Sequence, residues 1–292
     1  MSTRNGGILA SACSFLFVPA DRPDRYAKAI ATGADAIIID LEDAVGVDVK
    51  EQALSTMVRW LSQQRTDDRA DQEQAGQESQ PQIVVRINAL RSRWHAAEVA
   101  ALSGSDVAVM VPKAEDPAAL EALSGRLPGT AILALVETPI GVLEARALAS
   151  ASGVVRLALG NVDLAASIGV PPTSRHALAF ARSSLVHASA AAGIAAPVDG
   201  VTTTLRDPDA VIDDLRHGLE MGMGAKLCIH PGQVAPVNAA FLPSAREMAW
   251  AEQVLAVPDD GVATLHGEMI DRPVRLRAEA IRARGRRQGQ IG

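Results

Sequence analysis

Ionisable side chains stand directly after several short apolar runs in this sequence. Asp40-Leu41-Glu42-Asp43 follows one run, and Arg86, Lys113, Glu137 and Asp163 stand at the ends of later ones. Helix capping explains isolated acids at such positions, because a carboxylate accepts hydrogen bonds from the start of a helix, but it does not explain the arginine and the lysine. We therefore interpret these residues as parts of one site where carboxylates and cationic groups converge.

Glu137 and Asp163 are the pair that predicts a metal site. They follow consecutive apolar runs, so adjacent strands would bring their carboxylates together. A few hard oxygen ligands, with water completing the shell, suit Mg²⁺, and no His or Cys cluster has the spacing of a zinc site. An ion held there would chelate a carboxylate and an adjacent keto oxygen and act as a Lewis acid.

The other ionisable groups leave alternative roles open. Arg86 lies in a V-R-I-N run, and its planar guanidinium suits a substrate carboxylate; the alternative is a structural ion pair with Asp40 or Glu42. Glu42 and Asp43 either orient metal-bound waters or hold Arg86. Lys113 either pairs with these acids or binds an anion. A Schiff-base role for Lys113 is disfavoured, because an acidic setting keeps the amine protonated.

Eight apolar runs, separated by amphipathic segments, are the elements that must position these groups. Most runs are continuously apolar, which is typical of parallel strands buried on both faces. Alternation of strands and helices predicts a closed (β/α)₈ TIM barrel, with an open doubly wound sheet as the alternative. In a barrel, the strand ends meet at one mouth where active sites are built. The runs cover residues 14–19, 34–40, 82–88, 106–112, 130–137, 154–159, 195–198 and 225–229.

The composition bounds the class of protein. A length of 292 residues suits one barrel, which needs about 250. The net charge of −6 argues against general nucleic-acid binding, which requires a basic surface, and no apolar run has the length of a membrane span. The two cysteines, Cys13 and Cys228, lie in apolar runs and are expected as buried thiols in a reducing cytoplasm. Residues 62–82 are strongly polar, which predicts a mobile surface loop.

Seven motifs, which span almost the whole chain in order, resemble the HpcH/HpaI aldolase and citrate lyase superfamily, and specifically its citrate lyase β-subunit-like branch. They are F-V-P-A-D-R-P-D-R-Y-A-K-A (17–29), G-A-D-A-I-I-I-D-L-E-D-A-V (33–45), V-R-I-N (85–88), V-P-K-A-E (111–115), V-E-T-P-I-G-V (136–142), C-I-H-P-G-Q-V (228–234) and G-E-M-I-D-R-P-V (267–274).

The resemblance implies roles for the residues of the barrel mouth. It implies Mg²⁺ on Glu137 and Asp163, binding of the substrate carboxylate by Arg86, and a place for Glu42 and Asp43 beside the metal-bound waters. It also implies acyl-CoA thioester substrates and assembly into homotrimers or hexamers.

The resemblance also implies roles for residues outside that set. The aspartate of the C-terminal G-x-M-I-D-x-P segment, here Asp271, would enter the site of a neighbouring protomer for acid–base chemistry. Residues 1–257 are therefore expected as the catalytic barrel, and 258–292 as a lid segment with a helix. Arg22 and Arg25 near the first strand, with Lys28, are compatible with binding CoA phosphates. Val162 stands where many relatives carry a glutamate, which removes a charge near the site.

The expected activity is Mg²⁺-dependent carbon–carbon cleavage of a β-hydroxyacyl-CoA of the malyl, citramalyl or citryl type. The products would be an acyl-CoA and a 2-keto acid, so the protein would be an oxo-acid lyase. One alternative is a 2-keto-acid aldolase that uses no CoA. Another is a complex-bound citrate lyase β subunit that acts on an acyl-carrier-protein thioester.

Overall fold

The computed structural model describes residues 4–71, 80–258, 263–265 and 268–286. These residues form two compact units, Met1–Val237 and Asn238–Gly292, and each is described by itself. In the described part of the chain, every helix is too short or too polar to span a bilayer.

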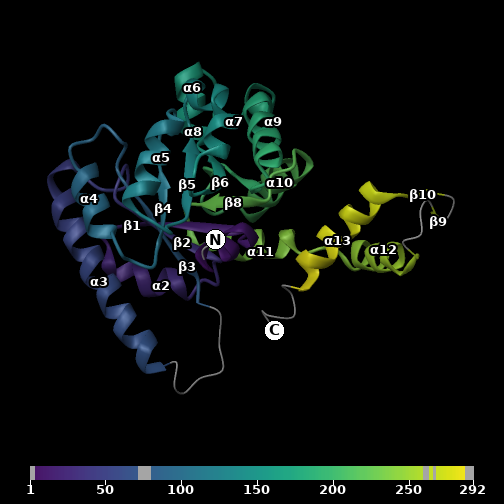
Figure 1. Cartoon of the computed structure of the whole chain (residues 1–292), viewed down its shortest axis with the longest axis horizontal. Coiled ribbons are helices and arrows are strands. Elements are labelled where there is room, and N and C mark those ends of the chain that lie inside the picture. The colour runs from purple at the N-terminus through teal and green to yellow at the C-terminus, as the bar shows by residue number, and fades with distance from the viewer. Residues whose placement is uncertain (1–3, 72–79, 259–262, 266–267, 287–292) are drawn as a thin grey trace. The chain divides into compact units, whose positions relative to one another are not determined.

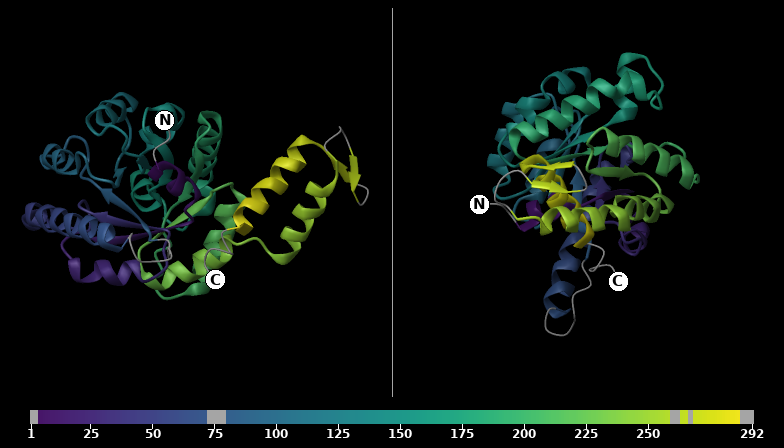
Figure 2. Two further views of the ribbon diagram at one scale, coloured as in Figure 1. Left: turned by 60° about the horizontal axis from the view of Figure 1, so that its bottom comes forward. Right: turned by 90° about the vertical axis from the view of Figure 1, so that its right-hand side faces the viewer.

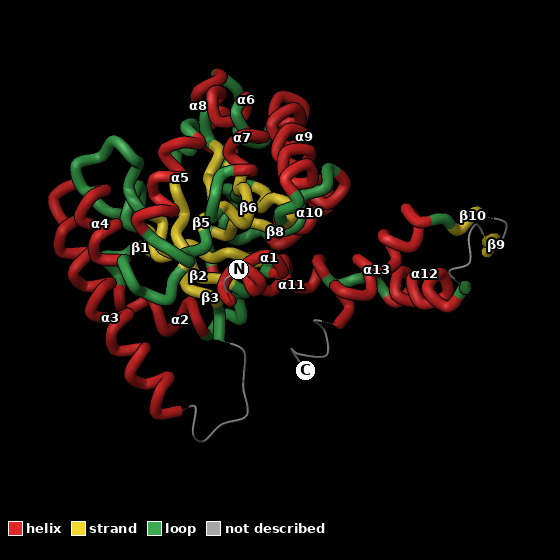
Figure 3. Tube along the Cα trace, in the orientation of Figure 1, coloured by secondary structure: helices red, strands yellow, loops and turns green. Residues whose placement is uncertain are grey.

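Strands β1 to β8 of the first unit form a closed parallel barrel, which confirms the predicted fold and excludes the open sheet (Figures 1 and 3). The barrel closes where Ser14 of β1 pairs with Lys226 of β8. Several strands end one or two residues before the predicted run does, so Asn88 and Glu137 lie in the loops that follow β3 and β5 rather than at the ends of strands. The strands are β1 (Ser14–Pro19), β2 (Ala36–Asp40), β3 (Gln82–Arg86), β4 (Ala108–Val111), β5 (Ile132–Val136), β6 (Val154–Leu159), β7 (Ala195–Asp199) and β8 (Ala225–Cys228).

Helices surround the strands, as the turned views in Figure 2 show. Asp116 and Asp207 each accept backbone N–H groups at a helix start that also carries proline at its first position, which fixes where those helices begin. The helices between strands are α2 (Tyr26–Ile30), α3 (Lys50–Asp71), α4 (His95–Leu102), α5 (Pro117–Arg126), α6 (Pro139–Leu143), α7 (Ala145–Ser150), α8 (Asn161–Ile168), α9 (Arg175–Ala192) and α10 (Pro208–Glu220), with α11 (Val234–Phe241) after β8. Single 3₁₀ turns are η1 (Pro23–Arg25), η2 (Val47–Val49) and η3 (Pro231–Gln233).

Three local features differ from the expectations. Helix α3 continues to Asp71, so the first part of the expected loop 62–82 is helical, while residues 72–79 lie outside the described residues. Helix α8 begins at Asn161, directly after β6, where the sequence predicts the end of the sixth strand and no helix. An additional helix, α1 (Arg4–Ser11), precedes β1.

The barrel interior is a buried apolar core, and α1 closes it at the end where the strands begin. Leu9 and Ala12 belong to the same buried cluster as Phe15, Met110 and Leu133. The buried guanidinium of Arg156 satisfies backbone groups at that end, because its Nη1 donates to the carbonyls of Leu9 and Ala12 over 2.9 and 2.6 Å. The mouth of the barrel therefore remains the open end.

The second unit is a helical hairpin with a short ribbon between its arms. Helix α12 (Ala245–Ala256) begins at a capping box formed by Ser244 and Glu247. The antiparallel strands β9 (Ala263–Leu265) and β10 (Glu268–Ile270) precede α13 (Arg272–Arg286). Apolar residues of α12, β10 and α13 share one buried cluster, so α12 belongs to this unit, which begins earlier than the boundary expected between residues 257 and 258. The cluster comprises Ala251, Val254, Ile270, Ala278 and Ile281.

Candidate active site

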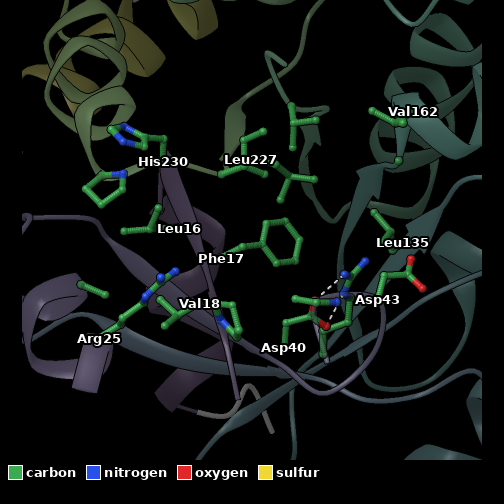
Figure 4. A pocket seen from close by; sticks show the side chains of 18 of the residues that line it. Leu16, Phe17, Val18, Arg25, Asp40, Asp43, Leu135, Val162, Leu227 and His230 are labelled. Atoms are coloured by element: carbon green, nitrogen blue, oxygen red, sulfur yellow. Dashed lines mark hydrogen bonds and ion pairs between the residues drawn. The ribbon is translucent and has the colours of Figure 1, made fainter. Parts of the chain in front are cut away.

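A cavity of about 820 Å³ lies at the carboxyl ends of the barrel strands (Figure 4). Its floor is the last apolar layer of the barrel core, which includes Phe17, Leu135 and Leu227. Ionisable side chains from the ends of several different strands stand on its walls. They are Asp40 at the end of β2, Asp43 after β2, Arg86 of β3, Glu137 after β5 and Asp163 after β6. The barrel thus brings together residues that are far apart in the sequence.

Glu137 is the buried carboxylate that follows β5 on the wall of this cavity. Only 3% of the residue is exposed, and its Oε1 accepts the backbone N–H of Lys113 over 2.8 Å. A Cβ atom on Gly160 would lie 2.5 Å from Glu137 Oε2, so only glycine lets the end of β6 approach the carboxylate this closely. Burial, together with the charge of Glu42, raises the pKa of Glu137 to about 8. A cation beside it would reverse that effect.

Asp163 stands in the first turn of α8 and faces the same cavity as Glu137. Its charge is one of the causes that raise the pKa of Glu137, after burial and the charge of Glu42. The neighbouring side chain of Val162 lines the cavity and is 40% exposed, so the surface beside Asp163 is apolar. Asn161 ties this turn to the next strand end, because its amide exchanges two hydrogen bonds with the backbone of Val201.

These residues fit a Mg²⁺ site formed by two carboxylates. Among the described residues, there is no group of three or more His, Cys, Asp or Glu side chains placed to hold a metal ion. Two carboxylates leave coordination positions for water and substrate oxygens, which is how proteins usually hold Mg²⁺. The buried Oε2 of Glu42 accepts no hydrogen bond and has an ion-pair contact with Arg86 Nη1 at 3.2 Å, so its hydrogen-bonding capacity is unused in this structure.

Arg86 forms the ion pair that the sequence left as an alternative. Its Nε and Nη2 donate to the two oxygens of Asp40 over 2.7 and 2.6 Å, as the dashed lines in Figure 4 show beside Asp40. Its Nη1 lies 3.2 Å from Glu42 Oε2, and its guanidinium lies over the ring of Phe17. Burial lowers the pKa of Arg86, but the bond to Asp40 outweighs it and leaves the pKa raised, so the group stays charged. Arg86 still lines the cavity.

Lys113 has the contacts of a residue that pairs with the acids. Its Nζ lies 2.5 Å from Glu42 Oε1, 3.9 Å from Asp43 Oδ2 and 4.0 Å from Glu137 Oε1. Burial opposes the charge of Lys113, but the hydrogen bond to Glu42 raises its pKa overall. The φ angle of Lys113 is 49°, which places the residue in the left-handed backbone region that residues other than glycine rarely adopt. This backbone conformation lets one residue reach Glu137 through its N–H and Glu42 through its ammonium.

The remaining predicted site residues lie at the mouth of the cavity or in the second unit. Arg22, Arg25 and Lys28 line the cavity from η1 and α2, and Arg22 forms an exposed ion pair with Asp24. Asp271 belongs to the second unit, where its Oδ1 accepts the N–H of Val274 over 3.2 Å at the start of α13. The site described here is therefore built from the first unit alone.

A second layer of polar residues lies behind Glu42 and Asp43 and was not predicted from the sequence. Lys50, Asn88 and Glu98 are buried. Lys50 and Asn88 both donate hydrogen bonds to the carbonyl of Leu41, next to Glu42, and Asn88 also donates to Glu98. Asn88 had a detectable signal, since it ends the V-R-I-N motif. Lys50 and Glu98 had none, because both look like ordinary surface residues of amphipathic helices.

The model of the family described as HpcH/HpaI aldolase/citrate lyase matches residues 13–231. A citrate lyase subunit beta-like protein of Mycobacterium tuberculosis is 34% identical over 281 residues, which are 93% of this chain and 95% of that protein. A (3S)-malyl-CoA thioesterase of Cereibacter sphaeroides is 30% identical over 93% of this chain and 96% of its own length. The crystal structure of CitE from Mycobacterium tuberculosis, in complex with magnesium, acetoacetate and coenzyme A, superimposes with a TM-score of 0.77 at 32% identity, covering 94% of this chain and 99% of that one. This chain therefore belongs to the HpcH/HpaI aldolase/citrate lyase family.

Proposed function

We propose that this protein is a Mg²⁺-dependent lyase that cleaves a β-hydroxyacyl-CoA into an acyl-CoA and a 2-keto acid. One observation carries the proposal, namely that Glu137 and Asp163 from consecutive strand ends face the same cavity as the guanidinium of Arg86. A metal and a fixed guanidinium in one cavity suit a substrate that presents a carboxylate next to an oxygen-bearing carbon. The magnesium and coenzyme A bound by the related CitE support the same assignment.

Each residue of the barrel mouth then has a role that its contacts support. Glu137 and Asp163 hold the ion, which when bound supplies Lewis acidity to the oxygen of the keto acid. Arg86, fixed by Asp40, binds the carboxylate of the keto acid and so orients it. Glu42 and Asp43 orient water, and Lys113 holds these acids together as a charged counter-ion.

The thioester end of the substrate is assigned to the mouth of the cavity. Arg22, Arg25 and Lys28 line that region, and their charges suit the phosphates of CoA. In the cleavage direction, a base removes the hydroxyl proton, the carbon–carbon bond breaks, and its electron pair passes to the carbon next to the thioester carbonyl. Asp271 of a neighbouring protomer, in a homotrimer or hexamer, protonates that carbon and releases the acyl-CoA.

Product analysis tests this function. Malyl-CoA, citramalyl-CoA and citryl-CoA are incubated with the purified protein and Mg²⁺, because the apolar Val162 leaves the acyl group open. We expect equal amounts of an acyl-CoA and a 2-keto acid. Free CoA with an intact hydroxy acid would instead indicate thioester hydrolysis, the activity named for the Cereibacter sphaeroides relative.

Two further measurements separate the remaining alternatives. Titration calorimetry with acetyl-CoA, a 2-keto acid and Mg²⁺ should detect binding of the thioester; absence of binding, together with aldol cleavage, would identify an aldolase that uses no CoA. Turnover of a free CoA thioester would exclude a subunit that works only on an acyl-carrier-protein partner.

A further inference from the structure

The acidic loop after β2 is held from behind by a buried ammonium. Lys50, the first residue of α3, donates from Nζ to the carbonyls of Leu41 and Glu42, each over 2.7 Å. Only 6% of Lys50 is exposed, and its ammonium lies over the ring of Trp94. A buried charge of this kind is costly unless it is fully hydrogen-bonded, so its two bonds fix the path of the loop backbone.

The loop after β3 is tied to the same point. The side chain of Asn88 donates from Nδ2 to the carbonyl of Leu41 over 2.8 Å, so this carbonyl accepts from both Asn88 and Lys50. Glu98 of α4, which is 1% exposed, accepts two of the three N–H hydrogens of Asn88, the backbone N–H over 2.7 Å and one Nδ2 hydrogen over 2.5 Å. The carboxylate of Glu98 therefore determines the orientation of the Asn88 amide.

The side chains on the other face of this loop belong to the site. Asp43 and Arg86 line the cavity, and Glu42 contacts Arg86 and Lys113 directly behind that lining. Lys50, Asn88 and Glu98 lie one layer further back, on the other side of the loop backbone, and are absent from the described residues that line the cavity. Any rotation of the backbone at Leu41 and Glu42 therefore moves the acids that stand beside the metal ligands. Such partners behind a metal site typically change activity or metal affinity by about 10- to 100-fold when they are altered.

We propose that Lys50, Asn88 and Glu98 are positioning residues, which set the orientation of Glu42 and Asp43 toward the metal and the substrate without touching either. This proposal rests on the lyase function proposed above. It assigns to two charged residues of α3 and α4 a role in the reaction rather than in stability alone.

Three variants and one matched control test the proposal. Glu98→Gln keeps the shape but replaces one acceptor oxygen by an NH₂ group that faces an N–H of Asn88. Lys50→Met removes the donor, and Lys50→Arg restores a charged donor at the same position. Val99→Ala, at the adjacent buried residue of α4, lowers stability while it leaves the hydrogen bonds of Glu98 in place.

We expect Glu98→Gln and Lys50→Met to lower kcat about 10- to 100-fold at saturating Mg²⁺, with KM for the keto acid changed by less than about threefold because Arg86 is untouched. Lys50→Arg should recover part of kcat. Val99→Ala should keep the kcat of the wild type even where its Tm falls as much as that of Glu98→Gln. The proposal is overturned if Glu98→Gln has the same kcat as Val99→Ala at equal Tm. This comparison does not depend on Lys50→Met, so it still applies if Lys50→Met fails to fold.

A second readout separates this proposal from the proposed function. If the wild-type protein turns over none of the thioesters, the lyase assignment fails, and the positioning role is then read from Mg²⁺ affinity alone. Titration calorimetry with MgCl₂ should show about 10-fold weaker binding for Glu98→Gln than for Val99→Ala. Equal Mg²⁺ affinities of these two variants would refute the positioning role in that case.

Discussion

Lys113 hydrogen-bonds to Glu137 through its backbone N–H, while its ammonium hydrogen-bonds to Glu42 and forms only a longer ion pair with Glu137. The N–H of Lys113 donates to Oε1 of Glu137 over 2.8 Å, whereas its Nζ lies 4.0 Å from the same oxygen and bonds to Glu42 instead. One residue with a φ of 49° thus joins two carboxylates of different strands. Non-glycine residues persist in this conformation only where the surrounding contacts enforce it, and such positions often lie at functional sites.

The first prediction removes the ammonium of Lys113. In Lys113→Met the carboxylates of Glu42, Asp43 and Glu137 lose their shared cation, so the pKa of Glu137 should rise further. Mg²⁺ must displace the proton of Glu137, and the pH midpoint of Mg²⁺ binding should therefore move upward. Calorimetric titrations between pH 6 and 9 measure it, and Lys28→Met at the cavity mouth is the control. An unchanged midpoint in Lys113→Met would contradict the pairing of Lys113 with the acids.

The second prediction concerns stability and pH in the absence of metal. Glu137 has a pKa of about 8 in the folded protein against 4.5 for an ordinary glutamate, so the folded state keeps a proton that the unfolded state loses. The stability that this proton contributes is complete below about pH 4.5 and is lost as the pH rises through about 8, because the unfolded state then binds fewer protons. The loss should be on the order of 2–4 kcal/mol.

Urea unfolding in EDTA at pH 5, 7 and 9 measures this loss. Other buried acids also titrate, and the wild type is therefore compared with Glu137→Gln, whose difference from the wild type isolates Glu137. Adding Mg²⁺ should restore the stability of the wild type at pH 9 and leave Glu137→Gln unchanged. Parallel pH profiles for the two proteins would disprove the assignment of this proton to Glu137.

The third prediction uses the close approach of Gly160 to Glu137. In Gly160→Ala the new Cβ would overlap Glu137 Cβ and stand 2.5 Å from Glu137 Oε2, so the whole side chain of Glu137 and the backbone beside it must shift. We expect Mg²⁺ affinity to fall at least about 10-fold, because the ligand is displaced, while the barrel stays folded. Gly125→Ala in α5 is the matched control, since its Cβ would meet nothing within 4 Å. Equal Mg²⁺ affinity in both variants would show that Glu137 is not a ligand.

The barrel and its strands were predictable because burial on both faces leaves continuous apolar runs such as β2 and β5, which are fully buried in the structure. The polar strand ends stood out as candidate site residues because they interrupt those runs, and several of them line one cavity in the structure. Helix α8 was not predicted because Asp163 was assigned to the end of the sixth apolar run, whereas Asn161 already begins the helix. The part of α3 after Ser62 was missed because its residues are too polar to suggest packing.

The sequence indicated which residues could form the candidate site more readily than it indicated which of them contact one another. The sequence left two roles for Arg86, and only the fold shows that Asp40 takes both its Nε and its Nη2. Lys50 and Glu98 escaped notice because a charged residue near a helix start gives no sign that it will be buried. Their partners, the Leu41 carbonyl and the Asn88 amide, are brought to them by the pairing of β2 with β3, a tertiary feature.

The fourth prediction decides between the two roles of Arg86. Arg86→Lys keeps the charge but loses the two-pronged geometry that matches a carboxylate. If Arg86 binds the keto acid, KM for the 2-keto acid in the synthesis direction should rise about 10-fold or more, with Mg²⁺ affinity retained. Steady-state kinetics with varied keto acid measure this. A lower Tm with an unchanged KM would instead assign Arg86 to the structural ion pair with Asp40.

The last prediction separates two roles of Asp271. Its Oδ1 accepts the N–H of Val274 at the start of α13, and asparagine caps a helix about as well as aspartate does. Asp271→Asn should therefore keep Tm while it loses proton transfer, with kcat lowered about 10²- to 10⁴-fold and binding of keto acid and Mg²⁺ unchanged. Because Asp271 is proposed to act in a neighbouring protomer, mixed oligomers of Asp271→Asn and Glu137→Gln chains should regain activity that neither chain has alone. Activity absent from the mixture would place Asp271 in its own protomer's site, and wild-type kcat in Asp271→Asn would reduce its role to that of a helix cap.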